Sequence, residues 1–82
     1  MMITRDDVRR LLDGDSDAVL VLVEGRIEVI DPAALDTDDY RGALQVITRA
    51  ELVEQAGGED LSDRELVEQA AALDTAITEL GG

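Results

Sequence analysis

The side chains best suited to chemistry in this sequence are carboxylates, and the first group of them is spaced like a calcium-binding loop. Asp13-Gly14-Asp15-Ser16-Asp17, followed by Glu24, matches the acidic positions of such a loop. Ala18 stands where the loop needs a glycine, and the stretch from Ala18 to Glu24 has the pattern of a strand. If extended, that stretch places Glu24 about 23 Å from Asp17. We therefore predict no metal site here. If a metal ion were bound, its candidate ligands would be Asp13, Asp15 and Asp17.

A second acidic group, at Asp36, Asp38 and Asp39, could share a magnesium ion with the first or supply paired carboxylates for acid–base catalysis. No residue pattern fixes that geometry, and a run of charges is typical of a solvated loop. The chain contains no histidine, cysteine or lysine, so the usual general base, thiolate and amine nucleophiles are all missing. We expect neither an enzyme nor a bound cofactor.

The charge of the chain is strongly one-sided. Twenty acidic residues face seven arginines, which gives a formal net charge of -13. Because nucleic-acid binding draws its affinity from cationic contacts with phosphates, we expect no nucleic-acid partner, and anionic membrane surfaces are disfavoured for the same reason. The absence of lysine beside many Asp, Ala, Val and Arg residues indicates either a GC-rich genome or a salt-adapted, halophilic proteome.

The location of the protein is predicted from two features. Its longest apolar run, Ala18 to Val23, is far shorter than the roughly 20 residues that span a bilayer. The first residues have no signal-peptide pattern, because Asp6, Asp7 and Arg9 precede any apolar stretch. We therefore expect no membrane association and a cytoplasmic location.

Three helices are predicted from a pattern that occurs three times: an aliphatic residue, Ser or Thr, two variable residues, an acid and another aliphatic residue. The copies are Ile3 to Val8, Ile47 to Leu52 and Leu61 to Leu66. In each copy the hydroxyl and the acid can form a reciprocal capping box, and the aliphatic pair can form a hydrophobic staple. The helices should therefore begin near Thr4, Thr48 and Ser62, and end at Gly14, Gly57-Gly58 and Gly81-Gly82.

Three strands are predicted at Ala18 to Val23, Arg26 to Ile30 and Ala43 to Ile47, with a tight turn at Glu24-Gly25. Between the last two strands, Asp31 can cap one helical turn at residues 32–35, and residues 36–39 are typical of a loop. The sequence therefore predicts one α+β domain over residues 1–82, in the order α-β-β-β-α-α.

The first strand is apolar on both faces, which is typical of a central strand. We therefore expect the sheet order second, first, third, with residues 31–42 as the crossover. A plain meander is the alternative.

The last two helices have the length and turn glycines of a helix-turn-helix, but their charge does not suit DNA. The would-be recognition helix opens with Asp63-Arg64-Glu65, whereas helices that bind in the major groove present Arg, Lys, Asn or Gln to base edges. A plain helical hairpin is the simpler interpretation. An acidic ion-binding protein, or one that imitates DNA, is the alternative function.

The leading functional hypothesis is a small acidic protein-interaction module that docks on a protein partner or forms a homodimer. Apolar residues recur along the third helix at spacings of four and three, and three of them, Leu73, Ile77 and Leu80, are the predicted interface. If the helices cover one side of the first strand, the other side carries Ile30 and Ile47 among polar residues and suits an interface. In the alternative, a monomer, the first helix covers one side of the sheet and the last two helices cover the other.

The density of carboxylates leads to a prediction about salt. Repulsion among them should destabilise the folded state at low ionic strength, and screening should relieve it as the Debye length falls from ~30 Å at 0.01 M to ~3 Å at 1 M. We expect the midpoint of thermal unfolding to rise as sodium chloride increases over this range. A flat or falling midpoint would show that the charges are compensated locally.

Overall fold

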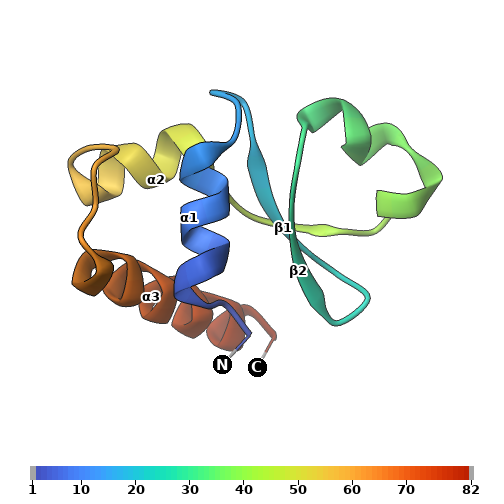
Figure 1. Cartoon of the computed structure of the whole chain (residues 1–82). Coiled ribbons are helices and arrows are strands. Elements are labelled where there is room, and N and C mark those ends of the chain that lie inside the picture. The colour runs from blue at the N-terminus through green and yellow to red at the C-terminus, as the bar shows by residue number, and fades with distance from the viewer. Residues whose placement is uncertain (1, 82) are drawn as a thin grey trace.

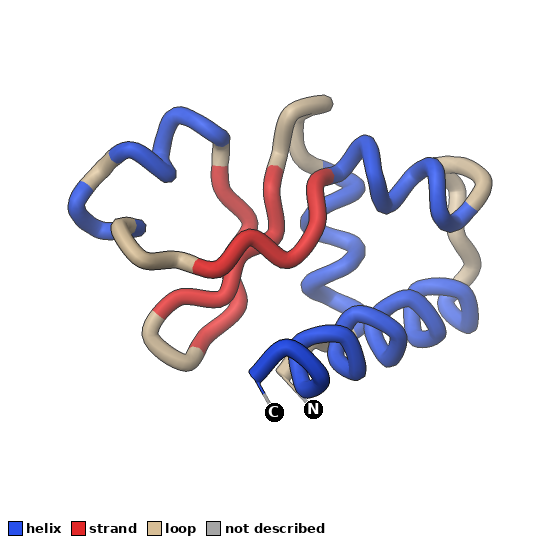
Figure 2. The backbone as a smooth tube through the Cα atoms, turned by 180° about the vertical axis from the view of Figure 1, so that it is seen from behind, coloured by secondary structure: helices blue, strands red, loops and turns tan. Residues whose placement is uncertain are grey.

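The chain folds as an α+β structure in which three helices cover one face of a three-stranded sheet (Figures 1 and 2). The computed structural model describes the backbone of residues 2–81 and their side chains up to Glu79. The helices are α1 (Arg5–Asp13), α2 (Arg49–Ala56) and α3 (Asp63–Gly81), and the strands are β1 (Val19–Val23), β2 (Arg26–Ile30) and β3 (Leu44–Thr48). The predicted class and element order are confirmed, and each observed strand lies within one residue of its predicted bounds.

The three helix starts are fixed by the capping boxes that the sequence predicts. At α2, the hydroxyl of Thr48 accepts from the N–H of Glu51 at 3.1 Å, and the Glu51 carboxylate accepts from the N–H of Thr48 at 3.1 Å. The same reciprocal pairs join Thr4 to Asp7 and Ser62 to Glu65. Because each box satisfies main-chain donors that a helix start leaves free, the starts are determined locally.

Glycines end the first two helices where expected. Gly14 is the C-terminal cap of α1, and Gly57 caps α2 in the left-handed conformation, with φ 83°. This backbone conformation is open to glycine without steric cost. In the last helix Gly81 is the final residue, while Gly82 lies outside the described residues.

β1 and β2 form a tight hairpin around Glu24 and Gly25. Both residues have positive φ values, 50° and 78°, which is typical of a type I′ turn and matches the right-handed twist of the strands. The pairing runs from Val23 opposite Arg26 to Val19 opposite Ile30. Since Glu24 is not glycine, its left-handed conformation is held by the hairpin around it.

The sheet has the order β2-β1-β3, and β1 is antiparallel to both neighbours, so the predicted crossover is confirmed. The register of β3 carries a bulge: Gln45 lies opposite Val21, but Ile47 lies opposite Leu20. Val46 is thus the extra residue. Because a shift of one residue turns a side chain to the other face, Ile47 points to the helices. The expectation that it shares a face with Ile30 is therefore wrong.

The two faces of β1 are covered by different parts of the chain. The leucine face, which carries Leu20 and Leu22, packs under all three helices, and its core holds these buried residues of the helices: Val8, Leu11, Leu52, Leu66, Ala70, Leu73 and Ile77. The valine face, which carries Val19, Val21 and Val23, packs against Leu35, Tyr40 and Ala43 of the crossover. The expected alternative, with α1 on one face and the last two helices on the other, is therefore wrong. The helices pack on the fully apolar leucine face. The crossover, which is narrower, packs on the valine face, where apolar and polar residues are mixed.

The crossover contains two 3-10 turns, η1 (Pro32–Asp36) and η2 (Asp38–Tyr40), on the side of the sheet away from the helices (Figures 1 and 2). The predicted turn at residues 32–35 is present, with proline in its first turn. Asp31 precedes it as expected, but its side chain makes no capping hydrogen bond. The segment 36–39, predicted as a loop, contributes Asp38 and Asp39 to η2, which brings Tyr40 over the valine face.

Arg49 links three elements around the ends of the helices. Its Nε donates to the carbonyl oxygen of Leu12, in the last turn of α1, at 2.9 Å, and its Nη2 lies 3.3 Å from Oε1 of Glu59 in the α2–α3 connection. The side chain is only 16% exposed. A cation at a helix C-terminus is favourable because the free carbonyls there carry partial negative charge.

We expect Arg49→Met to destabilise the fold by about 1–2 kcal/mol, because the Leu12 carbonyl loses its charged donor. Arg64→Met is the matched control: it changes the net charge equally, but its side chain is 89% exposed and pairs only with Glu68 on the same helix. The control should change stability by less than about 0.5 kcal/mol. Urea unfolding measures both, and equal effects would mean that net charge, not the contact with Leu12, is responsible.

Candidate functional site

The acidic residues predicted as metal ligands lie in exposed positions around the start of β1. Asp13 ends α1, and Asp15 and Asp17 lie in the turn that follows. The whole of β1 separates Asp17 from Glu24, so these two carboxylates lie at opposite ends of a strand. Asp15 and Asp17 instead line an open depression with Asp31, a residue from the start of the crossover. Within residues 2–79, no group of three or more acidic side chains is arranged to hold a metal ion.

The second acidic group is dispersed along the crossover. Asp36, Asp38 and Asp39 are all exposed, and Asp38 pairs with Arg41 at 3.0 Å. The depression lined by Asp15 and Asp17 does not include Asp36, Asp38 or Asp39. The first acidic group therefore lies around the start of β1, and the second lies along the crossover.

The apolar residues predicted for an interface lie on the inner side of α3. Leu73 and Ile77 are 6% and 8% exposed and belong to the core beneath the three helices. The side chain of Leu80 lies outside the described part of the chain. Leu73 and Ile77 therefore pack against other residues of this same chain.

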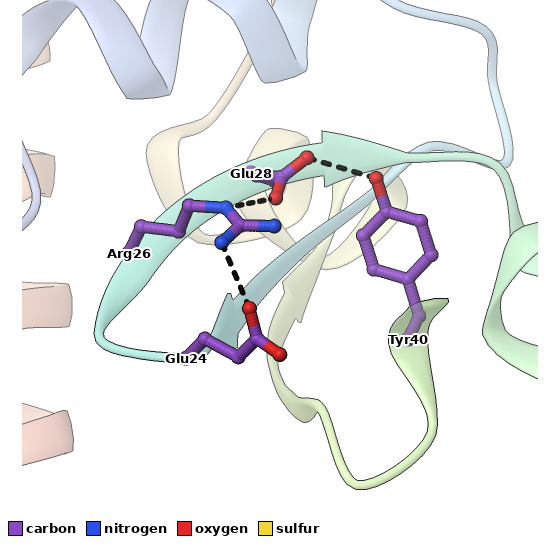
Figure 3. Close-up of polar contacts among 4 residues, drawn as sticks. All are labelled: Glu24, Arg26, Glu28 and Tyr40. Atoms are coloured by element: carbon purple, nitrogen blue, oxygen red, sulfur yellow. Dashed lines mark hydrogen bonds and ion pairs between the residues drawn. The ribbon is translucent and has the colours of Figure 1, made fainter. Parts of the chain in front are cut away.

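A connected cluster of polar side chains lies around β2 and the hairpin turn (Figure 3). The hydroxyl of Tyr40 donates to Oε1 of Glu28 at 2.8 Å, and the Nε of Arg26 donates to Oε2 of the same carboxylate. The other side of the guanidinium donates from Nη1 to Glu24 at 3.1 Å. The cluster therefore contains one cation between two carboxylates, and it connects the crossover to β2 through the only aromatic side chain of the protein.

These contacts shift the pKa values of the cluster in consistent directions. The hydrogen bond from Tyr40, followed by that from Arg26, lowers the pKa of the Glu28 carboxyl. The bond to Glu28, followed by burial, raises the pKa of the Tyr40 phenol, and the bond to Glu28 also raises the pKa of Arg26. At neutral pH the carboxylate is thus held as an acceptor and the phenol as a donor. The arrangement fixes geometry and supplies no reactive base or nucleophile.

β2 also forms an open edge of the sheet. In a two-residue hairpin the residues beside the turn, here Val23 and Arg26, exchange main-chain hydrogen bonds, and bonded pairs then alternate with non-bonded ones. Arg26, Glu28 and Ile30 therefore direct their main-chain groups to β1. Ile27 and Val29 direct theirs outward, and among the described residues no other element bonds to them.

At the opposite edge, β3, two features hinder the addition of a further strand. Its register is broken by the bulge at Val46, and the N–H of Thr48 is already bonded to the Glu51 carboxylate of the capping box. Bulges and irregular edges hinder the addition of another strand. The regular, accessible edge of the sheet is thus that of β2.

The sequence contained part of the signal for this site. The alternation of Arg26, Ile27 and Glu28 places the two charges on one face of a strand, and the hairpin turn could be recognised. The partner Tyr40 could not, because it is twelve residues away from Glu28 and reaches it only through the path of the crossover.

Comparison with known protein families, with curated proteins and with solved structures finds no significant match to this chain. None of the helices described is long and apolar enough to cross a membrane.

The Tyr40–Glu28 bond makes a prediction about pH. We expect Tyr40 to titrate above its ordinary value of about 10, and Glu28→Gln to lower its pKa because the charged acceptor is lost. The folded-state pKa is raised, so this bond stabilises the fold fully below pH ~10, and the contribution is lost as pH rises through the folded pKa. Phenolate absorbance reports on Tyr40 alone, because the chain has one tyrosine and no tryptophan.

Glu68→Gln is the control for this titration, since Glu68 is an exposed glutamate of α3 that contacts Arg64 and not Tyr40. It should leave the titration of Tyr40 unchanged, with circular dichroism confirming that each variant stays folded over the range used. An ordinary pKa for Tyr40 in the unmodified protein would contradict the assigned hydrogen bond.

Proposed function

We propose that this chain is a small acidic protein-interaction module that self-associates. The observation that supports it is the open edge of β2, where the main-chain groups of Ile27 and Val29 point outward from a regular strand. An unpaired edge is a template for another strand, and strand addition is a recurring mode of protein recognition. The side chains of Ile27 and Val29 are half-buried, so pairing along this edge would also remove apolar surface from water.

The charge of the protein sets the conditions under which copies can meet. Each copy carries a formal charge of -13, and two copies repel over distances longer than the Debye length. At an ionic strength of 0.15 M that length is about 8 Å, so the repulsion between distant charges is largely screened while contacts at the edge persist. Self-association should therefore be favoured by moderate salt.

The alternative functions have less support. For an ion-binding protein, the carboxylates at Asp15, Asp17 and Asp31 share a depression but do not converge on one point within the described chain. For a DNA mimic, the acidic composition is the only feature in favour. An enzyme would have to work without histidine, cysteine or lysine, which the composition lacks.

We expect size-exclusion chromatography with light scattering to give a mass above 8.8 kDa that rises with concentration toward twice that value. Because the edge is short, the affinity should be weak, so the test needs protein at about 0.1–1 mM and moderate salt. A mass of 8.8 kDa over this whole range of concentration and salt would refute self-association.

The variant Leu73→Glu distinguishes an interface at the β2 edge from an interface on α3. Since Leu73 is 6% exposed in the core, we expect this variant to unfold, as seen by circular dichroism. A folded, monomeric Leu73→Glu variant would instead place the interface on α3.

A further inference from the structure

We propose that the partner of the β2 edge is the β2 edge of a second copy, paired antiparallel about a two-fold axis that passes through Ile27. The two sheets then join into one continuous sheet. This inference rests on the proposed self-association and adds the surface, the register and the contacts that select it.

Hydrogen-bond geometry limits the registers of such a pair. Outward-pointing residues must pair with outward-pointing residues, so the axis passes through a residue and never between two. Each of the five residues of β2, Arg26 to Ile30, can be the centre. Each centre brings a different set of side chains opposite one another, and the charges on β2 distinguish them.

Only the centre on Ile27 places opposite charges across the interface. There, Arg26 of each copy lies opposite Glu28 of the other. A centre on Arg26 places the two arginines opposite each other, and a centre on Glu28 does the same with two carboxylates. Like charges directly opposite are unfavourable, whereas opposite charges stabilise a cross-strand pair. Centres on Val29 and Ile30 place no charged residue of one strand opposite a charged residue of the other.

The same register suits both faces of the joined sheet. Opposed residues of an antiparallel pair share a face, so the two Arg26–Glu28 pairs lie on the valine face, beside Tyr40. These are non-bonded pairs, in which the strands approach most closely. On the leucine face, the half-buried Ile27 side chains of the two copies meet and cover one another.

The excess of carboxylates in the cluster also favours the approach of Arg26 from the second copy. In one copy, Arg26 is shared between Glu24 and Glu28, so the cluster carries one cation for two carboxylates. The side chains of Arg26 and Glu28 are 56% and 28% exposed, and both can be reached from the edge. Pairing brings the arginine of each copy next to a carboxylate of the other, although the two proteins as a whole repel.

The test uses charge reversal. Arg26→Glu and Glu28→Arg each place like charges across the proposed interface, and each should raise the Kd of the homodimer by about tenfold or more. An equimolar mixture of the two variants should form a heterodimer, because both cross-strand pairs are again attractive. The double variant Arg26→Glu/Glu28→Arg should form a homodimer again. With a centre on Glu28, the double variant would place two arginines opposite each other, so like charges would still meet and the homodimer would not be restored.

Matched controls separate the local contact from net charge. Arg64→Glu and Glu68→Arg make the same charge changes on the exposed face of α3. If net charge alone governed association, Glu28→Arg and Glu68→Arg would both strengthen it. We expect Glu28→Arg to weaken it and Glu68→Arg to strengthen it slightly, as followed by light scattering and sedimentation.

A second readout does not depend on any variant. The amide protons of Ile27 and Val29 should become protected from hydrogen exchange as the concentration of the unmodified protein rises, while those of the exposed α3 face should not. If the protein dimerises but Arg26→Glu, Glu28→Arg and these amides show no effect, the interface lies elsewhere and this inference fails while self-association stands. If the unmodified protein stays monomeric throughout, both fail.

Discussion

Leu20 and Val21 lie on opposite faces of β1 and neither has any exposed surface, so an 82-residue chain must cover both faces of this strand. The three helices cover one face of β1, and the crossover covers the other. The helices bury the leucine face, where β2 and β3 add further apolar side chains such as Val29 and Ile47. The crossover needs to cover only the valine strip, because the neighbouring strands add polar residues there. The requirement for cover on both sides of β1 thus determines where every other element lies.

The polar residues on the valine face give the crossover specific contacts with the sheet. Arg26 and Glu28 are the only charged residues within the three strands, and both lie beside the path of the crossover. Tyr40 packs its ring on the valine cluster and donates its hydroxyl to Glu28, so one side chain contributes to both the apolar and the polar contacts. An aliphatic residue at position 40 would fill the space but leave the carboxylate with one partner fewer.

What could be predicted from the sequence is what is determined locally. Thr48 and Glu51 are three residues apart, and a capping box needs only their own backbone, so the helix starts could be recognised from residue types alone. The central position of β1 followed from its apolar residues on both faces. The side of the sheet that Ile47 would face could not be predicted, because it depends on a bulge at Val46 that only the pairing of β3 with β1 creates. The predicted interface at Leu73 followed the correct periodicity, yet periodicity marks a buried face without saying what buries it.

The two edges of the sheet show how the same physical problem is met differently. β3 is interrupted by its bulge and its last N–H is occupied by a carboxylate, so further pairing is hindered without regard to sequence. β2 keeps a regular edge and carries one arginine and one glutamate two positions apart. Charges on an edge strand oppose most pairings, because a neighbouring strand must tolerate both signs in the right places. A copy of the same strand in the Ile27 register does so, since antiparallel symmetry places each charge opposite its complement. In the pairing proposed here, the pattern that protects the edge against other strands is therefore also the one that would select its own copy.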